Sequence, residues 1–188
     1  MVKKKIICVV GRTATGKSSL VRDVCQKLGI KQVKSYTTRP MRQKEIENPN
    51  DTDHYFIKEN DVDQYKDDFA AYTEINGYKY FTTKQILDSS DIYVIDPQGI
   101  KKLKDICGDE YQIVTIYITV DHSVGKRRSI QRGESIDIYY ARYYSEDEQF
   151  SDFEKTMMWN YHILNTGTFE ESSNMMEKIV RKELNLYD

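Results

Sequence analysis

The stretch GRTATGKSS, residues 11–19, constrains the fold of this chain more than any other segment. It matches the pattern G-x-x-x-x-G-K-[ST] at Gly11, Gly16, Lys17 and Ser18. The apolar run Lys5–Val10 precedes it, and Lys17–Leu28 follows with an apolar face and with Gly29 as a stop. In this pattern the N–H groups of the loop and of the helix start surround a phosphate chain. A strand, such a loop and a helix in this order predict an α/β fold.

Strands and helices also alternate beyond residue 90. We expect strands at Ile92–Ile95, Gln112–Val120 and Tyr161–Leu164, and helices at Pro97–Ile106, from Asp121 or His122 onward, and at Phe169–Leu184. Strands that alternate with helices form a parallel sheet covered on both faces. The fold class that follows is α/β, with a three-layer parallel-sheet core of the P-loop NTPase type.

The region 37–90 differs from the rest in composition because it is rich in aromatic residues. The strand expected at Gln32–Thr37 leads into it, and the polar stretch RQKEIENPNDTD is expected to be a loop. Tyr55–Ile57 and Ala71–Phe81 have the pattern of strands, with a hairpin turn at Asn76–Gly77. We therefore expect a small mixed β/α insert within the core.

Charge and cysteine content narrow the function classes. A formal net charge of −2 argues against a nucleic-acid binder that acts by bulk electrostatics. The three cysteines are widely spaced and form no C-x-x-C pair, so neither a disulfide framework nor a zinc site is indicated. No apolar run is long enough to cross a bilayer or to act as a signal peptide. We expect a cytoplasmic monomer or homodimer with no nucleic-acid or membrane partner.

The phosphate-binding pattern indicates a nucleoside triphosphate together with Mg²⁺. We expect ATP to be bound by Gly11, Arg12, Thr13, Ala14, Thr15, Gly16, Lys17, Ser18 and Ser19. In this arrangement Lys17 reaches the terminal phosphates and is catalytic, and the Ser18 hydroxyl is a ligand of Mg²⁺. The alternative is an incidental Gly/Ser loop that caps a helix and binds no nucleotide.

A second cluster of donors lies in SYTTRPMR, residues 35–42. Arg39 and Arg42 offer planar forks for an anion with several oxygens, and Ser35 adds a hydroxyl. A phosphate monoester is the group that these donors suit best. A strand end followed by a solvated basic turn is the alternative, and the two arginines alone do not decide between them.

Taken in order along the chain, these motifs resemble the guanylate kinase family. After the phosphate loop, the resemblance rests on S-x-T-T-R-x-x-R at Ser35–Arg42, Asp53, G-x-x-Y at Gly77–Tyr80 and I-D-x-Q-G at Ile95–Gly99. It covers nearly the whole chain and implies ATP-dependent phosphoryl transfer to a nucleoside monophosphate, GMP + ATP to GDP + ADP. It also implies a core of residues 1–36 and 91–188, an acceptor-binding insert of residues 37–90 and a helical lid at about 125–146.

By position, the resemblance implies an acceptor-binding set of Ser35, Arg39, Arg42, His54, Tyr55, Tyr80, Thr82 and Asp96. Arg39 and Arg42 correspond to the arginines that hold the acceptor phosphate. The family has Asp-Tyr where this chain reads Asp-His-Tyr, so the hydroxyl donor is either replaced by His54 or displaced to Tyr55. A charged His54 could pair with a dianionic phosphate. A plain surface histidine is the alternative.

The segment KRRSIQRGESIDIYYARYY carries the arginines that the resemblance places in the lid. Arg128, Arg132 and Arg142 match by position, the last after a stretch one residue shorter than in the family. Together with Mg²⁺ and Lys17 they would be catalytic, because they stabilise charge on the transferred phosphoryl group. Arg128 and Arg132 are four residues apart and share a helix face. A solvated basic face is the alternative for such a run.

Base recognition is the property in which this chain departs from the family pattern. The position of the guanine-binding glutamate is Ala71 here, whereas the hydroxyl near the guanine carbonyl is kept as Thr82. Asp96 remains at a strand end, able to contact the base or, through water, the metal, and the family's other aspartate is Val94. Glu74 faces the opposite side of a regular strand from Ala71, so we do not assume that it substitutes.

Two further functions stay open beside a GMP kinase: a P-loop kinase of another nucleotide or small phosphate acceptor, and a non-catalytic guanylate-kinase-like protein-binding module. Ala71 leaves the first of these open, and the intact Gly16, Lys17 and Ser18 count against the second. The resemblance places Asn165 at the ATP adenine, and a turn-forming Asn is its alternative role. Packing is the alternative role for Tyr80.

Overall fold

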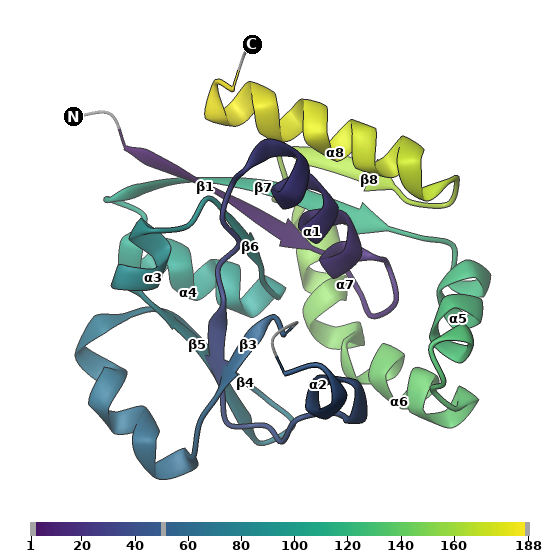
Figure 1. Ribbon diagram of the computed structural model, residues 1–188, viewed down its shortest axis with the longest axis horizontal. Helices are drawn as coiled ribbons and strands as arrows, with labels where there is room; N and C mark the ends of the chain where they lie inside the picture. Colours follow the sequence, from purple (N-terminus) through teal and green to yellow (C-terminus); the bar gives the residue numbers. More distant parts are fainter. Residues whose placement is uncertain (1–2, 50–51, 187–188) are drawn as a thin grey trace.

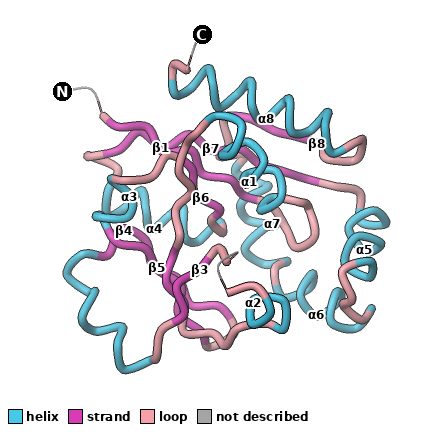
Figure 2. Tube along the Cα trace, in the orientation of Figure 1, coloured by secondary structure: helices cyan, strands magenta, loops and turns pink. Residues whose placement is uncertain are grey.

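The computed structural model of the protein describes residues 3–49 and 52–186, which form two four-stranded sheets surrounded by helices (Figure 1). The first sheet is parallel and contains, in order, β6 (Ile92–Val94), β1 (Lys4–Val10), β7 (Tyr111–Thr119) and β8 (Tyr161–Leu164). The second is mixed and contains, in order, β3 (His54–Phe56), β2 (Ser35–Thr37), β5 (Tyr78–Thr83) and β4 (Phe69–Ile75). Figure 2 shows the strands of each sheet gathered in a separate part of the molecule.

The helices connect these strands. Among the described residues they are α1 (Lys17–Leu28), α2 (Gln43–Glu47), the 3-10 helix η1 (Glu59–Asp68), α3 (Lys84–Asp88), α4 (Pro97–Cys107), α5 (His122–Gln131), α6 (Ile136–Ser145), α7 (Asp147–Thr156) and α8 (Phe169–Leu184). The side chains of Asp96, Ser135 and Thr168 cap α4, α6 and α8 by accepting a backbone N–H bond. The starts of these helices are therefore specified locally by the sequence.

β1 is buried on both faces, as a central strand of a parallel sheet must be. Ile7 and Val9 pack with the apolar sides of α1 and α8, whereas Ile6, Cys8 and Val10 pack with α4 and α7. All five side chains are fully buried. This alternation of faces along one apolar strand produces a layer of helices on each side of the sheet, which confirms the predicted three-layer α/β core.

An aromatic cluster stabilises the second sheet. The ring centroids of Tyr36 and Phe81 lie 5.1 Å apart, and those of Phe69 and Phe81 lie 4.6 Å apart. The β4–β5 hairpin turns at Asn76 and Gly77, whose φ angles of 52° and 76° are the positive values that a tight two-residue turn requires. The aromatic composition and the Asn-Gly pair thus account for this small sheet.

The chain changes from one sheet to the other within residues 33–35. The N–H of Val33 donates to the carbonyl of Ile92 at 2.8 Å, which attaches it to the edge of the first sheet. Two residues later β2 begins, and Tyr36 pairs with Phe81 in the second sheet. The strand expected at Gln32–Thr37 is thus divided between two sheets, and Ser35 already belongs to the second.

The expected loop RQKEIENPNDTD contains a short helix, α2, so that prediction was wrong in part. The reason lies in the tertiary contacts of Glu45. Its carboxylate accepts the backbone N–H of Arg42 at 2.7 Å, and it also accepts hydrogen bonds from Nη1 and Nη2 of the Arg39 guanidinium, both at 2.7 Å. Such contacts leave no hydrophobic periodicity in the sequence. The helices η1 and α3 were not predicted either.

The helices α5 and α6 form a hairpin at one side of the molecule, and α2 lies near α6 in the same view (Figure 1). The two helices are joined at Gly133, which has a φ of 87°, and α6 continues almost directly into α7. Tyr139 of α6 is buried and its hydroxyl donates to the carbonyl of His122 at 3.3 Å. In the described part of the chain, no helix has the length and apolar character to cross a membrane.

Candidate active site

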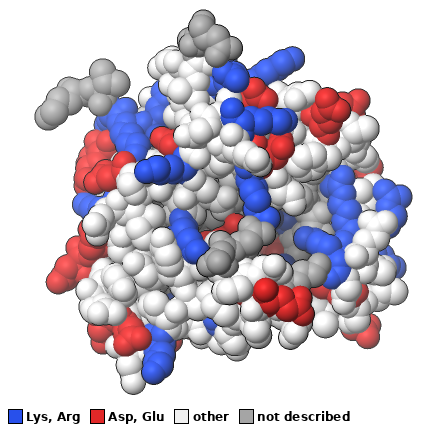
Figure 3. All heavy atoms as spheres, viewed as in Figure 1, with Lys and Arg blue, Asp and Glu red and all other residues white. Residues whose placement is uncertain are grey.

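A cavity of about 290 Å³ lies between the two sheets and the α6–α7 junction. Lys17 and Ser18 line it from the start of α1, Arg42 and Tyr80 line it from the side of the second sheet, and Arg142 lines it from α6. Figure 3 shows this face of the molecule hollowed near its centre, with basic side chains around the hollow. The cavity therefore joins the phosphate-loop motif to the basic stretch that follows β2.

The loop between β1 and α1 approaches its neighbours so closely that two positions require glycine. Gly16 has a φ of 89°, and a Cβ atom there would lie 2.6 Å from the side-chain nitrogen of Asn165. A Cβ atom at Gly11 would lie 2.4 Å from the carbonyl oxygen of Ile118. Ala14 also has a positive φ, of 60°. The loop is thus fixed in shape by its contacts with the ends of β7 and β8.

Lys17 folds back over this loop. Its Nζ donates to the carbonyl oxygens of Gly11 and, at 2.8 Å, of Arg12. Burial lowers the pKa of Lys17 to about 8, and the nearby positive charge of Arg142 lowers it as well, whereas Glu146 raises it. The ammonium group of Lys17 is therefore poorly solvated. A bound anion would stabilise its charged form.

The small side chains of the loop have different surroundings. Ser18 lines the cavity, whereas Ser19 is exposed to solvent. Thr13 and Thr15 are buried, and Thr15 donates its hydroxyl to the carbonyl of Arg12 at 2.9 Å. Of these four residues, Ser18 alone places its hydroxyl on the cavity lined by Lys17.

Arg12 pairs with α7. Its guanidinium donates to Asp147 at 2.7 Å and to Glu154 at 3.5 Å, and it lies 5.1 Å from the ring centre of Tyr143. The loop thereby stays attached to the end of α6 and to α7. The side chain of Arg12 is a structural contact in this arrangement, although the sequence grouped it with the ATP-binding residues.

Asn165 holds the phosphate loop with its side chain. Its Nδ2 donates to the carbonyl of Thr15 at 2.8 Å, and its backbone N–H donates to the carbonyl of Thr119 at 2.8 Å. The residue is 2% exposed. The Nδ2 of the amide is thus engaged by the loop, whereas its Oδ1 is buried without a hydrogen-bond partner among the described residues.

The two arginines of the SYTTRPMR stretch have different roles. Nη1 and Nη2 of the Arg39 guanidinium donate to the Glu45 carboxylate, and the side chain lies 5.1 Å from the ring centre of Phe56, outside the cavity lining. Arg42 lines the cavity, and its pKa is lowered first by burial and then by the charges of Arg39 and Arg142. A guanidinium that lines a cavity beside other cations is a binding position for an anion.

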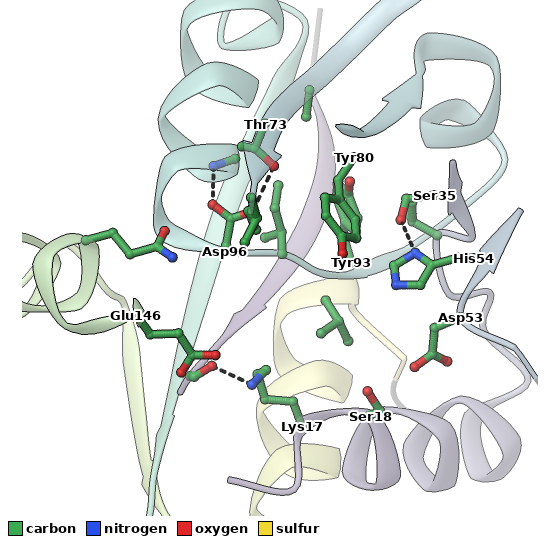
Figure 4. A pocket seen from close by; sticks show the side chains of 18 of the residues that line it. Lys17, Ser18, Ser35, Asp53, His54, Thr73, Tyr80, Tyr93, Asp96 and Glu146 are labelled. Atoms are coloured by element: carbon green, nitrogen blue, oxygen red, sulfur yellow. Dashed lines mark hydrogen bonds between the residues drawn. The ribbon is translucent and has the colours of Figure 1, made fainter. Parts of the chain in front are cut away.

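Ser35 and His54 face the cavity and hydrogen-bond to each other, with 2.9 Å between Oγ and Nδ1 (Figure 4). Burial lowers the pKa of His54 to about 4, and the charge of Arg39 lowers it further, so the ring is neutral at neutral pH. Tyr55 is the next residue on β3 and is exposed, outside the lining of the cavity. Tyr80 lines the cavity, 5.7 Å from the ring of His54.

Ala71 and Thr82 lie opposite each other in the β4–β5 ladder, and both are buried. Among the described residues the hydroxyl of Thr82 has no hydrogen-bond partner. A buried hydroxyl without a partner is costly. Thr82 is fully buried and lies behind Ala71, which lines the cavity, whereas Thr82 itself does not. Glu74 is exposed and lies opposite Lys79 in the same ladder, so its side chain is on the other face of β4 from Ala71, as expected from the strand alternation.

Asp96 is held at the start of α4 by two hydrogen bonds. One carboxylate oxygen accepts the N–H of Gly99 at 2.9 Å, and the other accepts the hydroxyl of Thr73 at 3.2 Å (Figure 4). Burial raises the pKa of Asp96, although these hydrogen bonds act in the opposite direction. Ala71, Val94 and Asp96 all line the cavity, so the carboxylate lies beside the position where the family has its glutamate.

The lid arginines lie at different depths. Arg128 extends to the phosphate loop, where its Nη1 is buried with no hydrogen-bond partner in the described residues and lies 3.9 Å from a Cβ position at Gly16. Arg132 is exposed at the end of α5 and donates its Nε to the carbonyl of Arg128 at 3.3 Å. Arg142 pairs with Glu134 and lines the cavity.

Three residues of the site were not identified from the sequence: Thr73, Glu134 and Glu146. Thr73 bonds to Asp96, Glu134 pairs with Arg142, and Glu146 accepts the backbone N–H of Thr13 at 2.7 Å. None of them belongs to a motif. The only signal in the sequence was an acidic residue, Glu134, within the basic lid segment.

A family model that matches nearly the whole chain identifies the family to which the chain belongs. The model of guanylate kinase matches residues 3–183. The chain belongs to the guanylate kinase family. It is accordingly a nucleoside monophosphate kinase, which transfers a phosphoryl group from ATP to GMP.

Two solved structures resemble this kinase in fold. A guanylate kinase from Anaplasma phagocytophilum superposes with a TM-score of 0.68 and 23% sequence identity, over 98% of this chain and 89% of that one. An uncharacterized protein from Eubacterium ventriosum ATCC 27560 has a TM-score of 0.52 and 12% identity, over 94% of this chain and 98% of the other. No curated protein matched the chain. The two structural matches show a common fold.

Proposed function

We propose that this kinase binds ATP at the loop between β1 and α1 and GMP against the second sheet, with both reacting phosphates in the cavity between them. One observation carries this proposal. Lys17 and Ser18 line the same cavity as Arg42 and Tyr80. Direct transfer between two nucleotides requires their phosphates to meet in one space from which water is excluded.

Neutralisation of charge is the main catalytic task in this proposal. The nucleophile is an oxygen of the acceptor phosphate, which is already anionic, so no general base is needed. Its bond to the γ-phosphorus forms as the bond from that phosphorus to the β-phosphate oxygen breaks. We assign stabilisation of the equatorial oxygens to Lys17, Arg128, Arg132 and Arg142. The exposed Arg132 would reach the phosphates only when α5 and α6 close.

We assign Mg²⁺ to the donor phosphates, with the Ser18 hydroxyl as its protein ligand. Ser18 lines the cavity from the first turn of α1. The described residues contain no group of three or more His, Cys, Asp or Glu side chains that could hold a metal by themselves. This donor set suits Mg²⁺, because in nucleotide enzymes the ion takes few protein ligands and several phosphate and water oxygens. Bound there, it would neutralise charge on the β- and γ-phosphates.

The acceptor phosphate is assigned to Arg42 and Arg39, with Ser35, His54 and Tyr80 as neutral hydrogen-bonding groups. Glu45 fixes Arg39 in direction through two hydrogen bonds. Tyr55 is left out of the proposal, because it is exposed and does not line the cavity.

The guanine base is assigned to the region of Ala71. We propose that the hydroxyl of Thr82 bonds to the guanine carbonyl and that Asp96 accepts from its N–H edge. The support is the buried hydroxyl of Thr82, which lacks a partner among the described residues, and the carboxylate that Thr73 and Gly99 hold in the cavity.

We propose that the chain is divided into a core, a lid and an acceptor-binding part, which together carry out the transfer. Residues 1–36 and 91–188 form the core, with a lid at about 125–146, and residues 37–90 form the acceptor-binding part. The passage between the two sheets at residues 33–35 supports a hinge at this point. Closure of lid and insert would exclude water from the transfer.

A coupled assay of ADP release tests the function. Wild-type protein is incubated with ATP, Mg²⁺ and each of GMP, dGMP, AMP, CMP, UMP and dTMP. Selective turnover with GMP is expected, with dGMP next. Preferred turnover of another nucleotide would overturn the base assignment, and no turnover with any of the six would overturn the catalytic proposal.

A further inference from the structure

A carboxylate lies in the anion-binding loop of this kinase. Glu146 stands at the junction of α6 and α7, and its Oε2 accepts the backbone N–H of Thr13 at 2.7 Å. Thr13 belongs to the loop whose N–H groups bind phosphate in proteins with this motif. Figure 4 shows the carboxylate of Glu146 beside Lys17. The carboxylate of Glu146 thus occupies the backbone N–H of Thr13, a donor that could otherwise bond to a phosphate oxygen.

The surroundings of Glu146 are cationic. Burial raises the pKa of this carboxyl, although the hydrogen bond from Thr13 and the positive charges of Lys17, Arg142 and Arg12 act to lower it. Glu146 is one of the residues that line the cavity. The loop therefore attracts a negative charge, and Glu146 supplies one from the junction of α6 and α7.

Two anions cannot share one N–H donor and one lysine without strong repulsion in a weakly solvated site. We propose that Glu146 is a built-in competitor of the ATP phosphates, and that ATP binds by displacing its carboxylate from the N–H of Thr13 and from its place beside Lys17. The proposal rests on the ATP site described above and adds a residue that sets its affinity.

The displacement also affects the lid. The N–H of Glu146 bonds to the carbonyl of Arg142 one helical turn earlier, and the next residue, Asp147, pairs with Arg12. Release of Glu146 from the loop therefore loosens the attachment of the α6–α7 junction. Arg142, which faces the same cavity, then has a phosphate in place of a carboxylate as its neighbour.

The test compares Glu146→Gln with Glu148→Gln. Gln keeps the shape of the side chain and its hydrogen-bond acceptor but removes the charge. Glu148 is an exposed residue of α7, two positions after Glu146, and is absent from the cavity lining. Affinity for ATP is measured by calorimetry in the absence of GMP. We expect Glu146→Gln to bind ATP about fivefold to tenfold more tightly than wild type. Glu148→Gln should match wild type.

Titrations with AMP and GMP show which part of the nucleotide the change of affinity depends on. AMP lacks the terminal phosphates, so its affinity should stay within about twofold of the wild-type value, and the change for GMP should be smaller than that for ATP. Equal tightening of all three nucleotides would indicate a general charge effect and would overturn the proposal.

A second variant keeps the proposal testable if Glu146→Gln folds poorly, as judged by circular dichroism and thermal unfolding. Glu146→Ala removes both the charge and the acceptor, and the increase in ATP affinity should be at least as large. Affinity equal to or below wild type in the folded variants would overturn the role of Glu146 while leaving the ATP site intact. Failure of wild type and variants alike to bind ATP would instead overturn the ATP site itself.

Discussion

The phosphate loop forms its part of the cavity from one continuous segment, whereas the acceptor side brings together side chains from β2, β3, β4, β5 and the start of α4. In the loop, shape comes from glycines at positions where a Cβ atom would collide with backbone or side chain. On the acceptor side, shape comes from pairs such as Ser35 with His54 and Thr73 with Asp96. One region is encoded by a short motif and the other by the packing of a whole sheet. A single substitution in the phosphate loop should therefore abolish turnover, whereas a single substitution on the acceptor side should reduce it only in part.

Lys17→Ala should give the largest effect. We expect kcat to fall by at least about a hundredfold, because this cation serves charge that develops in transfer. The ADP-release assay measures it, with Lys27→Ala as the control, since Lys27 is on the same helix and pairs with Asp23 at its surface. Substantial residual turnover would mean that the phosphates do not rely on this loop.

Arg42→Ala should affect the acceptor alone. We expect kcat/KM for GMP to fall about tenfold to a hundredfold through loss of a charged hydrogen-bond donor, while the affinity for ATP measured without GMP stays close to wild type. Separate titrations of the two nucleotides give this result. Equal losses for ATP and GMP would show that the two regions are not separable.

A change of pH should affect the binding of ATP at the phosphate loop more than binding on the acceptor side. Because the pKa of Lys17 is lowered to about 8, the side chain is mainly charged at pH 7 and loses its proton as the pH rises through 8. The affinity for ATP should therefore fall by about tenfold between pH 7 and pH 9. His54 is neutral throughout this range, since its pKa is about 4, and should add nothing. An ATP affinity that is flat from pH 7 to pH 9 would contradict the lowered pKa.

Thr82→Val should give the smallest effect and the most specific one. We expect kcat/KM for GMP to fall about threefold to tenfold as a hydrogen bond to the base is lost. The free energy of unfolding should stay the same or rise, because a buried hydroxyl without a partner among the described residues is replaced by a methyl group. Thermal unfolding and kinetics are measured together. A loss of stability with unchanged kinetics would assign Thr82 a structural role.

The same contrast explains how much could be predicted from the sequence. The helix Lys17–Leu28, the strand Tyr161–Leu164 and the turn at Asn76–Gly77 were predicted where the structure has them, because glycines and local hydrophobic patterns specify them. The helix α2 was missed because Glu45 stabilises it through Arg39. Glu146 was missed because its partner Thr13 lies 133 residues away in the chain. Local signals cannot reveal such pairs.

The bond from the Asn165 side chain to the carbonyl of Thr15 joins residues 150 positions apart. Contacts of such long range form late, since most of the chain must be ordered before they can close. During synthesis, the phosphate loop is made before β8 and stays without this bond until β8 has been made and has docked beside β7. The growing chain thus acquires the competence to hold a nucleotide only after Asn165 has been added, 150 residues after the loop residue that its side chain holds.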